Sequence, residues 1–172
     1  MDRYEARITE GVIDPDNAQA RAATRLDDLA RRLANKGKGG WFSKPDPVQG
    51  LYMWGGVGRG KSMLMDLFFE TAPVTPKRRV HFHEFMGSVH DMLGEWRTMD
   101  ASARKRSEWR VRGAGDDPIA PAAKRIASGA NLLCFDEFQV TQIADAMILS
   151  RLFEALFQEG VTVVATSNRH PD

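Results

Sequence analysis

Residues 55–62 read Gly55-Gly56-Val57-Gly58-Arg59-Gly60-Lys61-Ser62 and match the phosphate-loop pattern G-x-x-x-x-G-K-[S/T]. A short apolar run, residues 51–54, precedes this loop, and a helical pattern over residues 63–69 follows it. The pattern requires a strand before the glycine-rich turn and a helix after it, and the sequence supplies both. We therefore predict a P-loop NTPase fold with a nucleotide site at residues 55–62.

Each residue type in this loop suits the binding of phosphate. Glycines let the backbone curl so that consecutive N–H groups point at phosphate oxygens, and the following helix adds the positive end of its dipole. We expect Lys61 to reach the β- and γ-phosphates and the Ser62 hydroxyl to join the magnesium shell. The predicted cofactors are ATP and Mg²⁺, and the predicted nucleotide-binding residues are Gly55, Gly56, Val57, Gly58, Arg59, Gly60, Lys61 and Ser62.

Two acidic residues follow a second hydrophobic run. Residues 132–135 are apolar, and Asp136 and Glu137 come directly after them. A parallel sheet binds its ligand at the carboxyl ends of its strands. We expect Asp136 to hold magnesium and Glu137 to activate the attacking water, a role that a hydrolase needs and a simple kinase does not. An Asp-Glu pair alone is more often a solvated strand end, but the phosphate loop favours the catalytic interpretation.

A polar residue also follows the last apolar run. Residues 161–166 predict a fourth strand, and Asn168 lies two residues beyond it. An amide at this place would lie between the acidic pair and the γ-phosphate and help to position water, although asparagine also favours turns. The predicted catalytic residues are therefore Lys61, Glu137 and Asn168.

The whole chain alternates between strand and helix patterns. A further strand is expected over residues 79–83, and helices are expected over residues 17–35, 84–96, 118–128 and 141–158. Continuous apolar strands between helices predict an α/β fold, in which helices cover both faces of a parallel sheet. We expect the fourth strand to lie at an edge of the sheet. In the last helix, the expected buried face consists of Ile143, Met147, Ile148, Leu152, Ala155 and Leu156.

The same patterns suggest two regions in the chain. Residues 1–45 are interpreted as an N-terminal helical segment with a glycine-rich linker, and residues 46–172 as an incomplete P-loop ATPase domain. The sequence stops directly after a strand, and we expect a truncation at this point.

Composition limits the classes of partner. The 172 residues include 24 Lys and Arg against 23 Asp and Glu, and this net charge of +1 gives no bulk argument for binding nucleic acid or membranes. No uncharged apolar run reaches the ~18 residues that span a bilayer. The single cysteine, Cys134, cannot form an internal disulfide. We expect a cytoplasmic protein without an integral membrane segment.

Two local clusters have alternative interpretations. His81 and His83 would share one face of a strand and such a pair can bind metal, but hydrogen-bonded structural histidines are favoured. A basic stretch beside Trp96 and Trp109 would suit nucleic acid, but a solvated loop face is favoured. This stretch contains Arg104, Lys105, Arg106, Arg110 and Arg112.

Several short sequence segments together resemble those of the ZapE family of bacterial cell-division ATPases, which is related to a mitochondrial AAA-type group. The matching segments are residues 15–19, 50–52, 55–61, 80–86, 115–119, 134–140 and 165–169. The family commonly has threonine where this chain has Ser62, and either residue supplies the hydroxyl.

The resemblance implies an AAA-type module with five parallel strands, a helical lid and ATP hydrolysis at a subunit boundary. It matches Asn168 to the sensor asparagine of the family. It also implies that the full-length protein forms a homo-oligomer, and that its bacterial client is the FtsZ polymer. The arginine from a neighbouring subunit and the lid residues lie beyond the fourth strand in this family, so we expect the N-terminal portion only.

Four functions remain open at this point. An ATP-hydrolysing protein that remodels a protein polymer is the leading hypothesis. A nucleotide-gated binding module and a small-molecule P-loop kinase use the same loop. A helicase-loader-like ATPase acting on nucleic acid also fits the motifs, with the basic stretch as its support.

Overall fold

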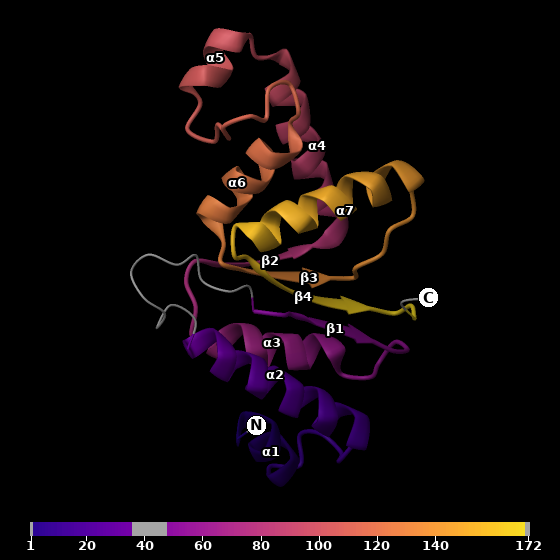
Figure 1. Cartoon of the computed structure of the whole chain (residues 1–172). Coiled ribbons are helices and arrows are strands. Elements are labelled where there is room, and N and C mark those ends of the chain that lie inside the picture. Colours follow the sequence, from indigo (N-terminus) through magenta and orange to yellow (C-terminus); the bar gives the residue numbers. More distant parts are fainter. Residues whose placement is uncertain (1, 36–47, 171–172) are drawn as a thin grey trace.

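The computed structural model describes residues 2–35 and 48–170. Its four strands form one parallel sheet in the order β1-β4-β3-β2 (Figure 1). These strands are β1 (Leu51–Trp54), β2 (Lys77–His81), β3 (Leu132–Asp136) and β4 (Thr162–Ser167). Every connection between them runs through at least one helix, as parallel pairing requires. The predicted α/β fold with a parallel sheet is confirmed.

The place of β4 in the sheet differs from the expectation. We expected β4 at an edge, but it pairs with β1 on one side and β3 on the other. The reason is burial on both faces, since Val164 packs against the helices of one side and Ala165 against those of the other. A strand that is apolar on both faces buries most surface in the middle of a sheet. The edges are β1 and β2.

Helices cover both faces of the sheet (Figure 1). On one face lie α1 (Asp2–Thr9), α2 (Asn17–Asn35) and α3 (Lys61–Thr71). On the other face lie α4 (Phe82–Thr98), α6 (Ile119–Gly129) and α7 (Ile143–Gln158). The short α5 (Ala101–Arg106) lies at the far end of α4, away from the sheet (Figure 1). The sequence patterns did not predict α1.

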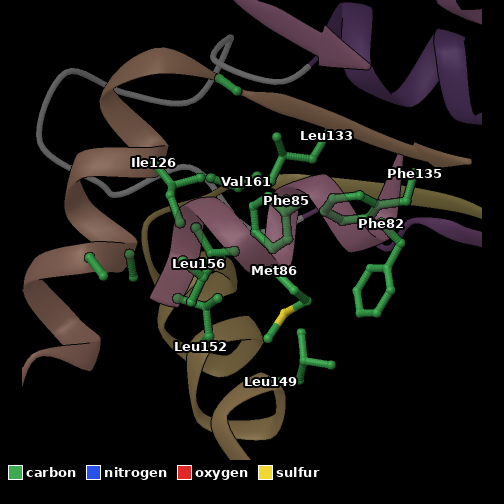
Figure 2. Close-up of a cluster of buried hydrophobic side chains, with 14 of the residues drawn as sticks. Phe82, Phe85, Met86, Ile126, Leu133, Phe135, Leu149, Leu152, Leu156 and Val161 are labelled. Carbon is green, nitrogen blue, oxygen red and sulfur yellow. The ribbon is translucent and has the colours of Figure 1, made fainter. Parts of the chain in front are cut away.

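The alternation of side chains along β3 divides the core into two clusters. Leu133 and Phe135 point to the α4, α6 and α7 side, whereas Leu132 and Cys134 point to the α2 and α3 side. Figure 2 shows the first cluster, in which Phe135 contacts the Phe85 ring at 4.7 Å between centroids. Each fully buried side chain of this size contributes roughly 1.5–3 kcal/mol. The strand is thereby fixed from both faces, and its carboxyl end has a defined place.

The boundary between β2 and α4 also differs from the expectation. We expected a strand over residues 79–83, but it ends at His81 and the helix begins at Phe82. Phe82, Phe85 and Val89 are buried with the three- and four-residue spacing of one helix face, and this packing extends the helix. His83 therefore lies on α4 rather than on the strand, although its ring still stacks on that of His81, with 5.9 Å between centroids.

The buried face of α7 is also different from the predicted one. Leu152 and Leu156 are buried as expected, together with Leu149. Ile143 and Met147, however, are 84% and 70% exposed. Met147 precedes Leu149 by two residues, which places it about 200° around the helix. The prediction for these two residues was wrong.

Two other expectations concern residues that the structure does not describe. The expected linker and the expected boundary between residues 45 and 46 lie outside the described residues. Among the residues that are described, no helix is both long and apolar enough to cross a bilayer.

Candidate nucleotide-binding site

A cleft of about 570 Å³ lies between the phosphate loop and the carboxyl ends of β3 and β4, and we call it the phosphate-loop cleft. It is lined by residues 57–62 on one side, and by Asp136, Glu137 and residues 166–168 on the other. The structure thus brings Lys61, Ser62, Asp136, Glu137 and Asn168 together around one cavity. Gly55 and Gly56 do not line this cleft but an adjoining groove.

The backbone of the loop depends on its glycines. Gly58 and Gly60 have φ angles of 79° and 74°, in the left-handed region that residues with a Cβ rarely adopt. Gly60 is also the N-cap of α3, so the helix begins at Lys61. The positive end of the helix dipole therefore points at the cleft, as a phosphate site requires.

The ammonium group of Lys61 is held inside the loop. Its Nζ donates to the carbonyl oxygens of Gly55 at 2.7 Å and Gly56 at 2.8 Å. An ammonium group has three donors, so one donor is left for a phosphate oxygen. Gly55 and Gly56 thus contribute through their carbonyls, which orient the lysine.

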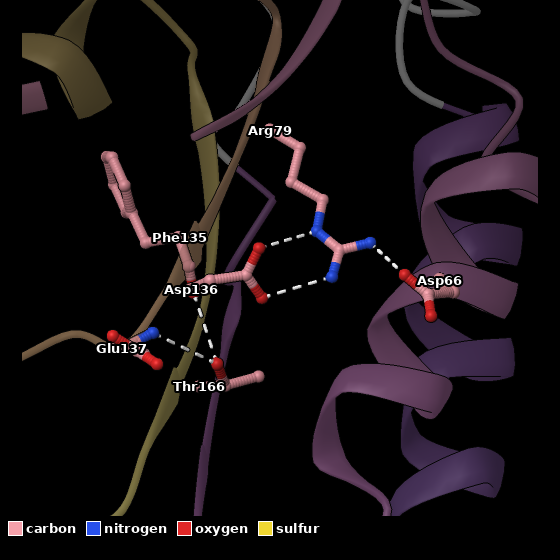
Figure 3. Close-up of polar contacts among 6 residues, drawn as sticks. All are labelled: Asp66, Arg79, Phe135, Asp136, Glu137 and Thr166. Carbon is pink, nitrogen blue, oxygen red and sulfur yellow. Dashed lines mark hydrogen bonds and ion pairs between the residues drawn. The ribbon is translucent and has the colours of Figure 1, made fainter. Parts of the chain in front are cut away.

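Asp136 lies at the end of β3 and is bound by an arginine that sequence reasoning missed (Figure 3). Arg79 of β2 donates from Nε to Oδ2 at 2.7 Å and from Nη2 to Oδ1 at 3.2 Å. Its Nη1 donates to Asp66 on α3. The hydrogen bonds to Asp136 raise the pKa of Arg79 above its usual value, against the opposing effect of burial. The sequence could have indicated this role, because Arg79 and His81 alternate along a predicted strand and so share one face of it.

Glu137 follows in an unusual backbone conformation. Its φ angle is 55°, in the left-handed region. Its amide donates to the Thr166 hydroxyl at 3.4 Å, and the amide of Phe138 donates to the Thr166 carbonyl at 2.7 Å (Figure 3 shows the first of these bonds). The end of β3 is thereby tied to the end of β4, which fixes where the Glu137 side chain leaves the backbone. The sequence analysis gave Thr166 no role either, although a polar residue inside an otherwise apolar strand could have indicated one.

A groove of about 500 Å³ adjoins the loop on its other side, between the start of α2 and β1, and we call it the α2 groove. Arg59 and Lys61 line both the groove and the cleft. The Asp16 carboxylate caps α2 by accepting from the amides of Ala18 at 2.6 Å and Gln19 at 3.1 Å. These two amide hydrogen bonds, that of Gln19 first, lower the pKa of Asp16.

Gln19 brings the start of α2 against the phosphate loop. A Cβ on Gly60 would lie 3.0 Å from its Nε2 atom. Its Oε1 atom is buried and has no hydrogen-bond partner among the residues that the structure describes. Sequence reasoning assigned no role to Asp16 or Gln19, although residues 15–19 carried part of the family resemblance.

The oxygen donors of the phosphate-loop cleft fit Mg²⁺. Asp136 supplies a carboxylate and Ser62 a hydroxyl, and Mg²⁺ in nucleotide sites takes few protein ligands beside phosphate oxygens and water. Within the described ranges, no group of three or more His, Cys, Asp and Glu residues could hold a metal by itself. His81 and His83 therefore belong to no metal cluster of the described residues.

The basic stretch lies around α5, far from the sheet in Figure 1. Arg104 forms an ion pair with Asp116 and donates to the carbonyl of Trp96 at 3.1 Å. Trp96 itself is buried, and its ring contacts Trp109. Part of the stretch therefore serves to hold its own loop together.

Comparisons with known proteins give the same family as the motifs. A family model described as AFG1-like ATPase matches residues 1–172. Cell division protein ZapE of Escherichia coli (strain K12) is 39% identical over 188 residues, which cover 99% of this chain and 46% of that protein. Lactation elevated protein 1 homolog B of Danio rerio is 52% identical over 130 residues, which cover 76% of this chain and 25% of that protein. The chain thus spans less than half the length of these relatives.

Solved structures show the same fold at much lower identity. Domain III of the replication initiation protein DnaA of Thermotoga maritima has a TM-score of 0.56 and 17% identity, covering 92% of this chain and 55% of that chain. AMPPCP-bound DnaA of Aquifex aeolicus has a TM-score of 0.56 and 14% identity, covering 92% and 41%. This likeness identifies the AAA-type P-loop fold. The family model, by contrast, matches the full sequence, and this match shows that the chain belongs to the AFG1-like ATPase family.

Proposed function

We propose that the phosphate-loop cleft binds the phosphates of ATP with Mg²⁺, and that the protein hydrolyses ATP. One observation carries this proposal: the ends of three elements bring a lysine, a hydroxyl, two carboxylates and an amide to one cavity. Lys61 and the loop amides would hold the phosphates. Ser62 and Asp136 would hold Mg²⁺, which would supply positive charge against the phosphates.

Hydrolysis is assigned to Glu137 rather than to the loop. Its carboxylate lines the cleft and would accept a proton from the attacking water. Asn168, exposed after β4, would orient that water. A kinase needs no such base next to its metal-binding aspartate. The acidic pair therefore favours a hydrolase over the small-molecule kinase.

The α2 groove is the proposed place of the nucleoside. It continues from the phosphate loop, and Tyr52 and Trp54 give it aromatic surface. The unpaired Oε1 acceptor of Gln19 lies beside the loop and would suit the exocyclic amino group of adenine. Helix α2 would then be part of the nucleotide site.

The biological setting is proposed from the relatives. E. coli ZapE is named a cell division protein. We propose that the longer protein acts in cell division in the cytoplasm, as a homo-oligomer that uses ATP to remodel a polymer. FtsZ is the proposed client by family resemblance.

Calorimetric titration of the chain with ATP and Mg²⁺ tests the proposal. Lys61→Ala removes a cation beside two phosphates, a charge-assisted contact worth roughly 1.5–3 kcal/mol, so ATP should bind roughly 10- to 100-fold more weakly. Lys105→Ala, on exposed α5, removes the same charge far from the cleft and should leave the affinity unchanged. Equal affinities of the wild type and Lys61→Ala would contradict the proposal.

A further inference from the structure

Arg79 connects two elements of the nucleotide site. The two nitrogens Nε and Nη2 hold both carboxylate oxygens of Asp136 on β3, and Nη1 holds Asp66 on α3, the helix that follows the phosphate loop (Figure 3). Each of the three guanidinium nitrogens thereby donates to a carboxylate oxygen. The arginine lines the cleft in the same place as the aspartate expected to hold the metal.

The environment makes this contact strong. The side chains of Arg79 and Asp136 are only 24% and 14% exposed. A bidentate arginine–carboxylate pair is among the stronger hydrogen-bonded pairs, and partial burial reduces its screening by water. A divalent cation at Asp136 needs an oxygen of the same carboxylate and is repelled by the positive charge beside it.

We propose that Arg79 is the internal counterion of Asp136 in the nucleotide-free protein, so that a divalent cation binds there only together with nucleotide. The phosphates supply the further oxygen ligands and the negative charge that the cation needs to compete with the guanidinium. This role rests on the proposed function, because it concerns the metal of the same site. Arg79 is a positioning residue here, since it acts through Asp136.

Mn²⁺ binding without nucleotide, followed by electron paramagnetic resonance, tests the proposal. Arg79→Gln keeps a hydrogen-bonding side chain but removes the charge, and we expect about tenfold or more tighter Mn²⁺ binding than in the wild type. Arg78→Gln is the matched control. Arg78 is the exposed neighbour on the same strand and lines a pocket on the opposite face, so its loss should change nothing. Adding Asp136→Asn to Arg79→Gln should abolish the gain.

The outcomes separate the two proposals. Unchanged or weaker nucleotide-free Mn²⁺ binding by folded Arg79→Gln overturns the counterion role, even where the wild type binds Mn²⁺ with ATP. A wild type that binds no Mn²⁺ with ATP overturns the proposed function and this role with it. If circular dichroism shows that Arg79→Gln is unfolded, Arg79→Met replaces it. Methionine also removes the charge while it keeps a long side chain, so its Mn²⁺ affinity should exceed that of the wild type, and an equal affinity overturns the role.

Discussion

Glu137 combines a strained backbone with a place at the cleft. Its φ angle of 55° costs a residue with a Cβ roughly 1–2 kcal/mol. The hydrogen bonds of residues 137 and 138 to Thr166 hold this conformation. Strain of this kind persists where the surroundings impose it and gathers at functional positions. The strain is therefore consistent with the catalytic role proposed for this side chain.

A comparison of two small residues at this position measures the strain. We expect Glu137→Gly to be more stable to denaturant than Glu137→Ala by about 1 kcal/mol, because glycine adopts the left-handed region without cost. Glu154, exposed on α7, is the control. There Glu154→Gly should be less stable than Glu154→Ala by about 1 kcal/mol, as usual in a helix. The same order of stability at both positions would show that Glu137 is unstrained.

At the residue scale, the site residues within local motifs could be predicted from the sequence, whereas those that depend on contacts between strands could not. Lys61, Ser62 and Asp136 could be placed at a nucleotide site because loop and strand-end motifs lie within a few residues of sequence. The contact of Arg79 with Asp136 depends on how β2 aligns with β3, where Arg79 pairs with Cys134 and His81 with Asp136. The contacts of Thr166 with residues 137 and 138 depend in the same way on how β4 aligns with β3. The sequence alone does not provide these registers.

At the scale of elements, the start of α2 is the contact between the N-terminal helices and the loop. Asp16 caps the helix, and its carboxylate lies 3.9 Å from the guanidinium of Arg59 in the phosphate loop. The cap therefore fixes both the helix and one wall of the α2 groove.

The lowered pKa of Asp16 predicts a pH-dependent stability. Above the ordinary pKa of 3.8 the carboxylate is charged in both states and the cap stabilises the fold, whereas protonation as the pH falls through the lowered value removes this stabilisation. Asp16→Asn also caps helices but does not titrate. In urea unfolding, the wild type should be more stable than Asp16→Asn at neutral pH, and the difference should shrink below pH 3.8. A difference independent of pH would contradict the role of the charge.

Element order was easier to predict than element position. The alternation of strands and helices follows from hydrophobic periodicity, which is local. The central place of β4 follows from which strand buries most surface, and Ile143 and Met147 are exposed because apolar residues do not all face the core. Such outcomes depend on the packing of the whole chain.

At the scale of the molecule, the two helical layers bury residues 132–135 of β3 completely. Cys134, the single cysteine of the sequence, lies in β3 with no exposed surface. Burial raises the pKa of its thiol to about 12, which keeps it protonated and unreactive.

The reactivity of Cys134 therefore reports unfolding of the whole sheet. At pH 8, Ellman's reagent should react with the native chain at least about 10³-fold more slowly than with the denatured chain, since reaction needs an opening that costs most of the folding free energy. The rate should rise with denaturant together with the unfolded fraction. Fast stoichiometric reaction of the native chain would show that the two layers do not close over β3.

Amide hydrogen exchange with and without ATP and Mg²⁺ measures directly whether the phosphate-loop cleft is the nucleotide site. The loop amides of residues 57–62 would donate to phosphate, and Asp136 at the end of β3 and Asn168 just after β4 would lie against it. We predict slower exchange at these two regions in the wild type and no such change in Lys61→Ala. Unchanged exchange there, or protection confined to the basic stretch around α5, would contradict a nucleotide site in this cleft.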